Sequence, residues 1–339
     1  MKSSAGEGRW TKVDYHITQE GKLRRDGNTV SFVNQEGRRA LPVERIRAIY
    51  AYKTLSLSAG VIGLLCKQGI PVHFFGWYGN YEGTLWPREV LLSGEVVLRQ
   101  AEHYLDPGKR IELARLFVKG SISNLARNIS YYAAARPELK SYVEAFQVEA
   151  EKLQSYGTIS QLMSAEGHVR DAYYEALDSV FSEEFRIGSR ERRPPTNKGN
   201  ALLSFANSLV YTTVLSEIYS THLNPTISFL HEPYERRFSL ALDVAEIFKP
   251  ILADRTVFKL VNKRMLADSH FEGTLGDMAL SDAGRRLFLE SYQERLRTTI
   301  KHKGLGREVS YQRLIRLELY KLEQHLVGGR KYRPLVMWW

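Results

Sequence analysis

Three short segments carry side chains that bind hard metal ions. Glu166 lies in a helical stretch, and His231 lies in a loop bounded by prolines. Asp243 and Glu246 stand three residues apart, a spacing that puts both carboxylates on one face of a helix. Oxygen ligands with one imidazole suit Mg²⁺ or Mn²⁺ better than zinc, and such an ion activates water or a 3′-hydroxyl toward a phosphodiester. The segments therefore predict a metal-dependent site that acts on phosphate esters.

Each segment also has a simpler interpretation. Glu166 can be an exposed helix residue beside the tolerated Gly167, and His231 can be a structural histidine with Glu232 as a competing ligand. A mostly apolar helix that bears two carboxylates must satisfy them, and arginines can do so in place of a metal. Three arginines are near enough in sequence to serve as such partners: Arg236, Arg237 and Arg255.

The charge balance favours a polyanionic partner. Lys and Arg number 48 against 38 Asp and Glu, which gives a formal net charge of +10 and a pI of about 9.5. A basic loop at 183–198 supplies several of these charges; it is either a solvated surface loop or a phosphate-contacting one. From this loop and from arginines near the proposed ligands we predict these DNA contacts: Arg170, Arg186, Arg190, Arg192, Arg193, Arg236 and Arg237.

A chain of 339 residues exceeds the size at which a single core usually stops growing, so two domains are expected. Residues 1–85 alternate between apolar and polar positions with frequent turns, which predicts a small β-rich domain. Within it, Asp26-Gly27-Asn28 predicts a hairpin turn, and Ser58 predicts the start of a short helix. Residues 86–94 form the predicted linker.

Residues 95–339 have a helical period and few glycines or prolines, which predicts a larger all-α domain and an α+β fold class for the whole chain. The helices are expected at 110–132, 137–156, 159–182, 199–221, 239–261, 281–303 and 310–327. The proposed ligands fall on the helices expected at 159–182 and 239–261 and on the loop before 239.

The location is expected to be cytoplasmic, without a membrane partner. Cys66 is the single cysteine, which excludes an internal disulfide and a cysteine-rich zinc site. No stretch of about 18 uninterrupted apolar residues occurs, and residues 1–10 have no apolar signal-peptide core.

Taken together, the three segments resemble the universal CRISPR-associated integrase and endonuclease family of spacer acquisition. The resemblance rests on Glu-Gly in a helix at 166–167, Asn-Pro at 224–225 followed by His-Glu-Pro at 231–233, and Arg-Arg-Phe-Ser-Leu-Ala-Leu-Asp-Val-Ala-Glu at 236–246. Supporting stretches are Ile-Pro-Val-His-Phe-Phe at 70–75 and Asn-Ala-Leu-Leu-Ser-Phe-Ala-Asn at 200–207. The similarity therefore extends over both expected domains.

This resemblance implies a β-sandwich-like N-terminal domain used for homodimerisation and a helical catalytic domain. It implies that Glu166, His231 and Glu246 hold Mg²⁺ or Mn²⁺, and that Asp243 supports the site as a further catalytic residue. The implied partners are double-stranded and branched DNA and the small second CRISPR adaptation subunit. The implied reaction joins the 3′-hydroxyl ends of a protospacer to the CRISPR repeat by transesterification, and water in place of the hydroxyl gives a nuclease.

Two other functions use the same residues. A metal-dependent DNA or RNA nuclease outside CRISPR would hydrolyse DNA or RNA without strand transfer. A non-catalytic nucleic-acid-binding protein would bind without any cation requirement and would keep binding after loss of all three ligands.

Overall fold

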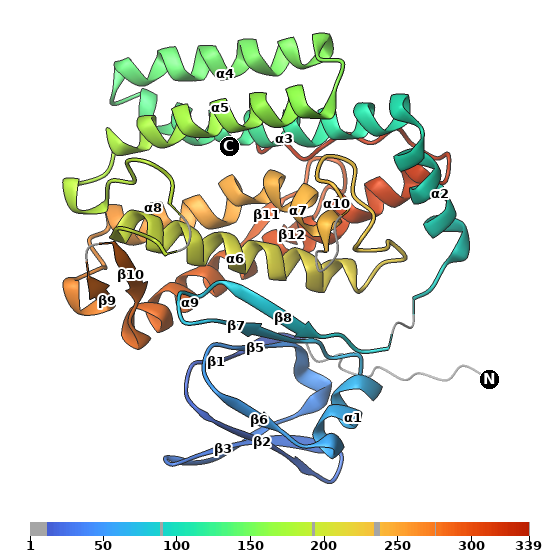
Figure 1. Cartoon of the computed structure of the whole chain (residues 1–339), viewed down its shortest axis with the longest axis vertical. Coiled ribbons are helices and arrows are strands. Elements are labelled where there is room, and N and C mark those ends of the chain that lie inside the picture. The colour runs from blue at the N-terminus through green and yellow to red at the C-terminus, as the bar shows by residue number, and fades with distance from the viewer. Residues whose placement is uncertain (1–11, 89–90, 192–193, 234–237, 275, 339) are drawn as a thin grey trace. The chain divides into compact units, whose positions relative to one another are not determined.

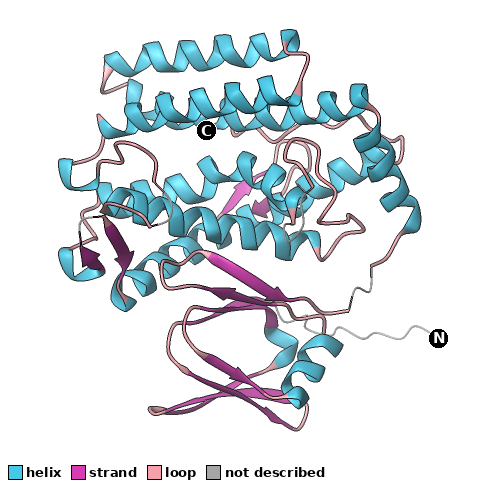
Figure 2. Ribbon diagram, in the orientation of Figure 1, coloured by secondary structure: helices cyan, strands magenta, loops and turns pink. Residues whose placement is uncertain are grey.

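The computed structural model describes residues 12–88, 91–191, 194–233, 238–274 and 276–338. It divides the chain into two compact units, residues 1–90 and 91–339, which are described separately. Short strands dominate the first unit and helices dominate the second (Figure 1 and Figure 2). The predicted α+β fold class is confirmed.

The first unit contains two four-stranded sheets. One has the order β1 (Val13–Ile17), β5 (Ile46–Ala51), β7 (Val72–Phe75) and β8 (Tyr81–Leu85), with only the last pair antiparallel. The other has the order β4 (Gly37–Leu41), β3 (Thr29–Asn34), β2 (Gly21–Asp26) and β6 (Leu55–Leu57). One short turn of 3₁₀-helix, Val43–Arg45, precedes β5.

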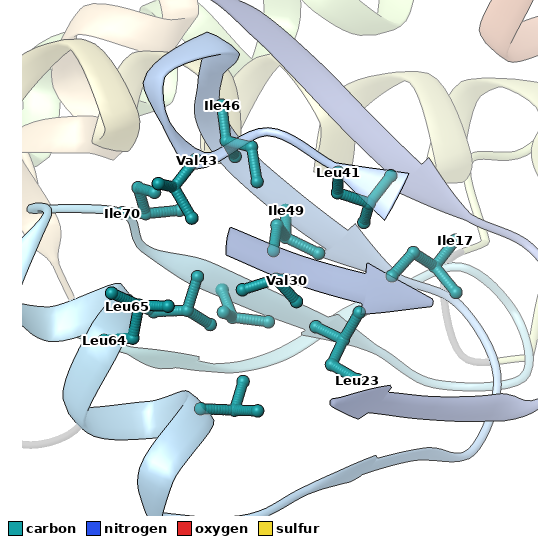
Figure 3. Packing of buried hydrophobic residues seen from close by; sticks show 12 residues of the cluster. Ile17, Leu23, Val30, Leu41, Val43, Ile46, Ile49, Leu64, Leu65 and Ile70 are labelled. Atoms are coloured by element: carbon teal, nitrogen blue, oxygen red, sulfur yellow. The ribbon is translucent and has the colours of Figure 1, made fainter. Parts of the chain in front are cut away.

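The core of this unit lies between the two sheets and helix α1 (Ala59–Lys67). Figure 3 shows side chains of the sheet with β5 meeting those of the sheet with β3; Ile49 and Val30 are fully buried there, and Leu65 of α1 packs beside them. Alternate residues of a strand point to opposite faces, so each sheet contributes one apolar face to this layer. The observed arrangement is sandwich-like, as the resemblance implies.

Both local signals read from the first unit are confirmed. Asp26 pairs with Thr29, so Gly27 and Asn28 form a two-residue hairpin turn. Gly27 has a φ of 60°, which the first central position of a type II′ turn requires. Ser58 caps α1, because its side chain accepts the backbone N–H of Val61 at 3.4 Å.

The second unit contains nine α-helices in its described part. Their bounds are α2 (Gly94–Leu105), α3 (Pro107–Ala133), α4 (Lys140–Lys152), α5 (Ile159–Asp178), α6 (Lys198–Ile218), α7 (Ser239–Phe248), α8 (Arg255–Asn262), α9 (Asp282–Arg297) and α10 (Tyr311–Leu326). In Figure 1, α3, α4 and α5 run side by side, and α6 passes through the body of the unit. On length and composition α6 is apolar enough to cross a membrane, but it is mostly buried inside the unit.

The second unit differs from the prediction in one unpredicted helix and in two β-hairpins. Helix α2 was not predicted, and the stretch 281–303 was expected to be one helix but is helical only to Arg297. Beyond that residue β11 (Thr299–Lys301) pairs with β12 (Glu308–Ser310). A second hairpin joins β9 (Phe271–Thr274) to β10 (Asp277–Leu280).

The stretch 239–261, predicted as one helix, is divided by a π-helical segment at Lys249–Asp254. Pro250 has no N–H to offer the carbonyl of the residue four before it, so the α-helical pattern cannot continue there. Two carbonyls of the segment accept hydrogen bonds from side chains of other helices. Asn128 of α3 donates to the carbonyl of Pro250 at 2.9 Å, and Arg295 of α9 donates to that of Ile251 at 3.1 Å.

A C-terminal segment at 332–337 crosses α3 beside α7. Asn124 donates its amide to the carbonyl of Leu335 at 2.9 Å and accepts the N–H of Met337 at 2.9 Å. A Cβ on Gly120 would lie 2.7 Å from Pro334, so only glycine allows this approach. The segment therefore closes the core over α3.

Candidate active site

The loop before α7 is fixed by one buried carboxylate. Asp243 is fully buried, and its two oxygens accept the backbone N–H groups of Phe229, Leu230 and His231 at 2.6, 2.9 and 2.9 Å. The same carboxylate bonds the Nδ1 of His231 at 2.8 Å. A buried aspartate needs such donors, and here they set both the loop and the imidazole. Asp243 is therefore a positioning residue whose oxygens already have partners.

The hydrogen bond to Asp243 also decides which nitrogen of His231 is available. Nδ1 must donate to the carboxylate, so Nε2 carries the free lone pair of the neutral ring. Burial lowers the pKa of His231, but the hydrogen bond and charge of Asp243 outweigh burial and the pKa is raised overall. The negative charge of Glu246 also raises this pKa.

Glu166 of α5 and Glu246 of α7 are joined by one guanidinium. Arg170, one helical turn after Glu166, donates from Nε to Glu166 Oε1 at 2.7 Å and from Nη2 to Glu246 Oε2. Lys249 donates to the other oxygen of Glu246. Burial raises the pKa of Glu246, yet these two cations outweigh it and lower the pKa to about 2. Glu246 is thus ionised at all physiological pH values.

A further carboxylate, Asp254, lies at the end of the π-helical segment and was not predicted. It accepts the hydroxyl of Tyr173 at 2.8 Å and is buried. Its pKa is raised from 3.8 to about 6, first by burial and also by the negative charge of Glu246, despite the opposing effects of Tyr173, Arg170 and Lys249. The charged form of Asp254 is therefore unfavourable in the folded protein.

Replacing Asp254 with asparagine is expected to stabilise the protein above pH 6. A raised folded-state pKa means that this residue contributes stability below about pH 4, and that the contribution is lost as the pH rises to about 6. The difference between 3.8 and about 6 corresponds to an upper bound of about 3 kcal/mol. Urea unfolding at pH 4 and pH 8 measures the free energy of unfolding of both proteins. The variant should be more stable than the unchanged chain only at pH 8. Equal differences at both pH values would show that Asp254 does not titrate in this range.

The sequence-predicted residues fall into three groups. Glu166, His231, Asp243 and Glu246 come together in one region of the second unit. Four predicted DNA contacts lie outside the described residues: Arg192, Arg193, Arg236 and Arg237. The other predicted contacts are Arg170, which is buried in the site itself, Arg186, which is exposed, and Arg190, which bonds Asn200 and Ser204.

The competing interpretations of the site are also answered by contacts. Glu232 accepts hydrogen bonds from Arg110 at 2.6 Å and from Tyr104 at 3.0 Å, so it anchors the loop to α2 and α3. A counter-charge for the helix carboxylates does exist, but it comes from Arg170 and Lys249. Both follow a carboxylate by three or four residues, a spacing that could have identified them in the sequence.

The donor set fits a hard divalent cation by its chemistry. Two carboxylates and an imidazole with a free Nε2 are ligands that Mg²⁺ and Mn²⁺ accept. Within the described ranges, no three His, Cys, Asp or Glu side chains already stand in a metal-binding arrangement. The guanidinium of Arg170 lies between the two glutamates and bonds to both of them.

Together, the fold and the site define a class: a two-unit α+β protein with an acidic, arginine-bridged site in its helical unit. A family model described as CRISPR associated protein Cas1 matches residues 15–294. The CRISPR-associated protein Cas1 1 of Methanobrevibacter ruminantium is 48% identical over 329 residues, which cover 97% of this chain and 100% of the relative. The CRISPR-associated endonuclease Cas1 of Methanothermobacter thermautotrophicus is 49% identical and covers 97% and 96%. The chain therefore belongs to the Cas1 family of CRISPR-associated endonucleases.

Solved structures agree with this family. A Cas1 protein from Thermotoga maritima superposes with a TM-score of 0.86 at 39% identity, covering 95% of this chain and 100% of that one. A casposase bound to its integration product has a TM-score of 0.82 at 20% identity, covering 96% and 92%. At that identity the casposase shows a shared fold only.

Proposed function

We propose that this chain is a cation-dependent DNA integrase and endonuclease of CRISPR adaptation, which joins protospacer 3′-hydroxyl ends to the CRISPR repeat. The proposal rests on the meeting of Glu166 and Glu246 at the guanidinium of Arg170, with His231 held by Asp243 of the same helix as Glu246. These three residues would hold Mg²⁺ or Mn²⁺. When bound, such an ion polarises the phosphodiester and stabilises the charge that develops on attack by a hydroxyl or by water.

The other residues of the site position and balance charge. Asp243 holds the loop and directs Nε2 of His231 away from itself. Arg170 and Lys249 supply positive charge beside the glutamates, where a phosphate must approach.

A strand-transfer assay tests the function directly. The full chain is incubated with labelled DNA carrying either a 3′-hydroxyl or a 3′-dideoxy end, a target with a CRISPR repeat, and Mg²⁺, Mn²⁺ or EDTA. We expect joined products only with the 3′-hydroxyl and a divalent cation. Hydrolysis without joining would favour a nuclease outside CRISPR, and DNA binding without any cation-dependent product would favour a non-catalytic nucleic-acid-binding protein.

DNA binding is expected to weaken steeply with salt, because each neutralised phosphate releases counterions. Arg186 is exposed at the start of the basic loop, whereas Lys198 at its end pairs with Glu184 and Asp268. Replacing Arg186 with glutamine should therefore reduce the slope of log affinity against log salt by about 1. Fluorescence anisotropy over a salt series measures the slope. Arg38→Gln is the control, because Arg38 is exposed but already paired with Asp26. If the Arg186 variant had the same slope as the unchanged chain, Arg186 would not be a DNA contact.

The proposed partners are a second copy of this chain and the small second adaptation subunit. A chain of the Cas6-RT-Cas1–Cas2 complex has the same fold, with a TM-score of 0.85 at 17% identity, and covers 100% of this chain and 38% of that one. We place the homodimer contact in the N-terminal unit, whose two sheets end in edge strands that need covering. Removal of residues 1–85 should leave a protein that sediments as a monomer, and a truncated dimer would refute this placement.

The cytoplasm is the proposed location, since Cys66 needs no oxidising compartment.

A further inference from the structure

Arg170 occupies the position where the two glutamates would share a cation. Its side chain is buried, it reaches Glu166 along its own helix, and it reaches Glu246 across to α7. The hydroxyl of Ser121 on α3 lies 3.4 Å from the Nη2 atom of Arg170, the atom that also bonds Glu246. The guanidinium is thus held on three sides by groups of α3, α5 and α7.

A guanidinium that bonds both carboxylates competes with a metal ion for them. Arginine has donors only, so it cannot become a ligand itself. Both oxygens of Glu246 already accept from cations, Oε2 from Arg170 and Oε1 from Lys249. On Glu166, by contrast, both contacts of Arg170 fall on Oε1. A divalent ion shared by both glutamates must therefore approach a Glu246 whose two oxygens each already face a cation, and the like charges oppose that approach.

The charges of the site give the same result. Glu166 and Glu246 are balanced by Arg170 and Lys249, so these four groups sum to zero. Adding a divalent ion leaves a surplus of positive charge in a buried place, which is costly unless a cation leaves or an anion arrives. A phosphodiester carries the negative charge that would restore the balance.

We propose that Arg170 is a displaceable counter-ion: it holds Glu166 and Glu246 together while no divalent cation is bound, and it must leave them when one binds. This inference rests on the proposed metal site. The released guanidinium pairs with a DNA phosphate, for which its planar donors are well suited. Cation and DNA therefore bind cooperatively, each strengthening the other.

Titration calorimetry of the full chain with Mn²⁺, in the absence and presence of a DNA duplex, tests the proposal. The unchanged chain should bind Mn²⁺ more tightly when DNA is present. Arg170→Gln removes the competitor, so in the absence of DNA this variant should bind Mn²⁺ about tenfold more tightly than the unchanged chain. DNA should then increase the Mn²⁺ affinity of the variant by a smaller factor than that of the unchanged chain. Lys249→Gln frees only one oxygen of Glu246 and should give a smaller gain.

Controls separate the possible failures. Arg170→Lys preserves the charge but cannot reach both glutamates in the same way, so an intermediate affinity supports displacement even if Arg170→Gln proves unstable by circular dichroism. Equal or weaker Mn²⁺ binding by both Arg170 variants, together with loss of binding in Glu246→Ala, would overturn the counter-ion role alone. Unchanged Mn²⁺ binding in Glu246→Ala would overturn the metal site and this inference with it.

Discussion

Replacing His231 with alanine is expected to abolish cation-dependent cleavage and strand transfer. The imidazole is the only nitrogen donor in the proposed ligand set, and Asp243 fixes its orientation at 2.8 Å. Loss of a metal ligand removes both the cation and the alignment that it gives, so a reduction of at least about 10³-fold in rate is expected, which corresponds to about 4 kcal/mol of barrier. DNA affinity should change less than about twofold, because phosphate contacts outside the site supply it.

The rate of strand transfer, measured in single-turnover reactions beside an anisotropy assay of DNA binding, distinguishes these effects. His222→Ala is a matched control, since His222 lies on the same connection and its ring bonds Glu323 outside the site. Normal integration by the His231 variant would remove His231 from the metal site. Family membership would stand, because it rests on similarity along nearly the whole chain.

Replacing Asp243 with alanine is expected to give a large loss of stability. The substitution leaves three backbone N–H groups of a buried loop without their acceptor. Each such group costs about 1 to 3 kcal/mol, and partial access of water to the loop should limit the total to about 3 to 5 kcal/mol. Asp243→Asn preserves the shape but turns one acceptor into a donor, so its loss should be smaller.

Urea unfolding measures the stability change, with Asp277→Asn, an exposed carboxylate of the β9–β10 hairpin, as the control. The activity of folded Asp243→Asn should also fall, because the His231 ring loses its orientation. An unfolding free energy within about 0.5 kcal/mol of the unchanged chain for Asp243→Ala would show that water, and not this carboxylate, satisfies the loop.

The hairpin turn and the helix cap of the first unit could be predicted from the sequence, because each is determined by neighbouring residues. The turn at Gly27 and the cap at Ser58 depend on one or two residues each, and both were found where expected. Helix α2 was missed although its residues follow a helical apolar period, and it begins at Gly94, inside the stretch assigned to the linker. The β11–β12 hairpin was missed because its two strands are only three residues long.

The candidate ligands were predicted by resemblance, since residues as distant as Glu166 and Glu246 cannot be brought together by local pattern. Their electrostatic partners follow helical spacing. Arg170 was predicted as a DNA contact, and its burial between the two glutamates was not predicted. Asp254 was missed for another reason. The π-helical segment changes the residue period after Pro250, so a helical wheel drawn from Ser239 misplaces it.

The segment at 332–337 has a consequence for how the chain folds during synthesis. Asn124 and Leu335, which share a hydrogen bond, are separated by 211 residues. At 5 to 20 residues per second, a ribosome needs about 10 to 40 s to cover that distance. During this interval α3 has emerged, but the segment that covers its surface around Gly120 and Asn124 has not yet been made. The strands of the first unit pair over much shorter separations, so it can fold early, while the helical unit with the site completes its core only after residue 337 has left the ribosome.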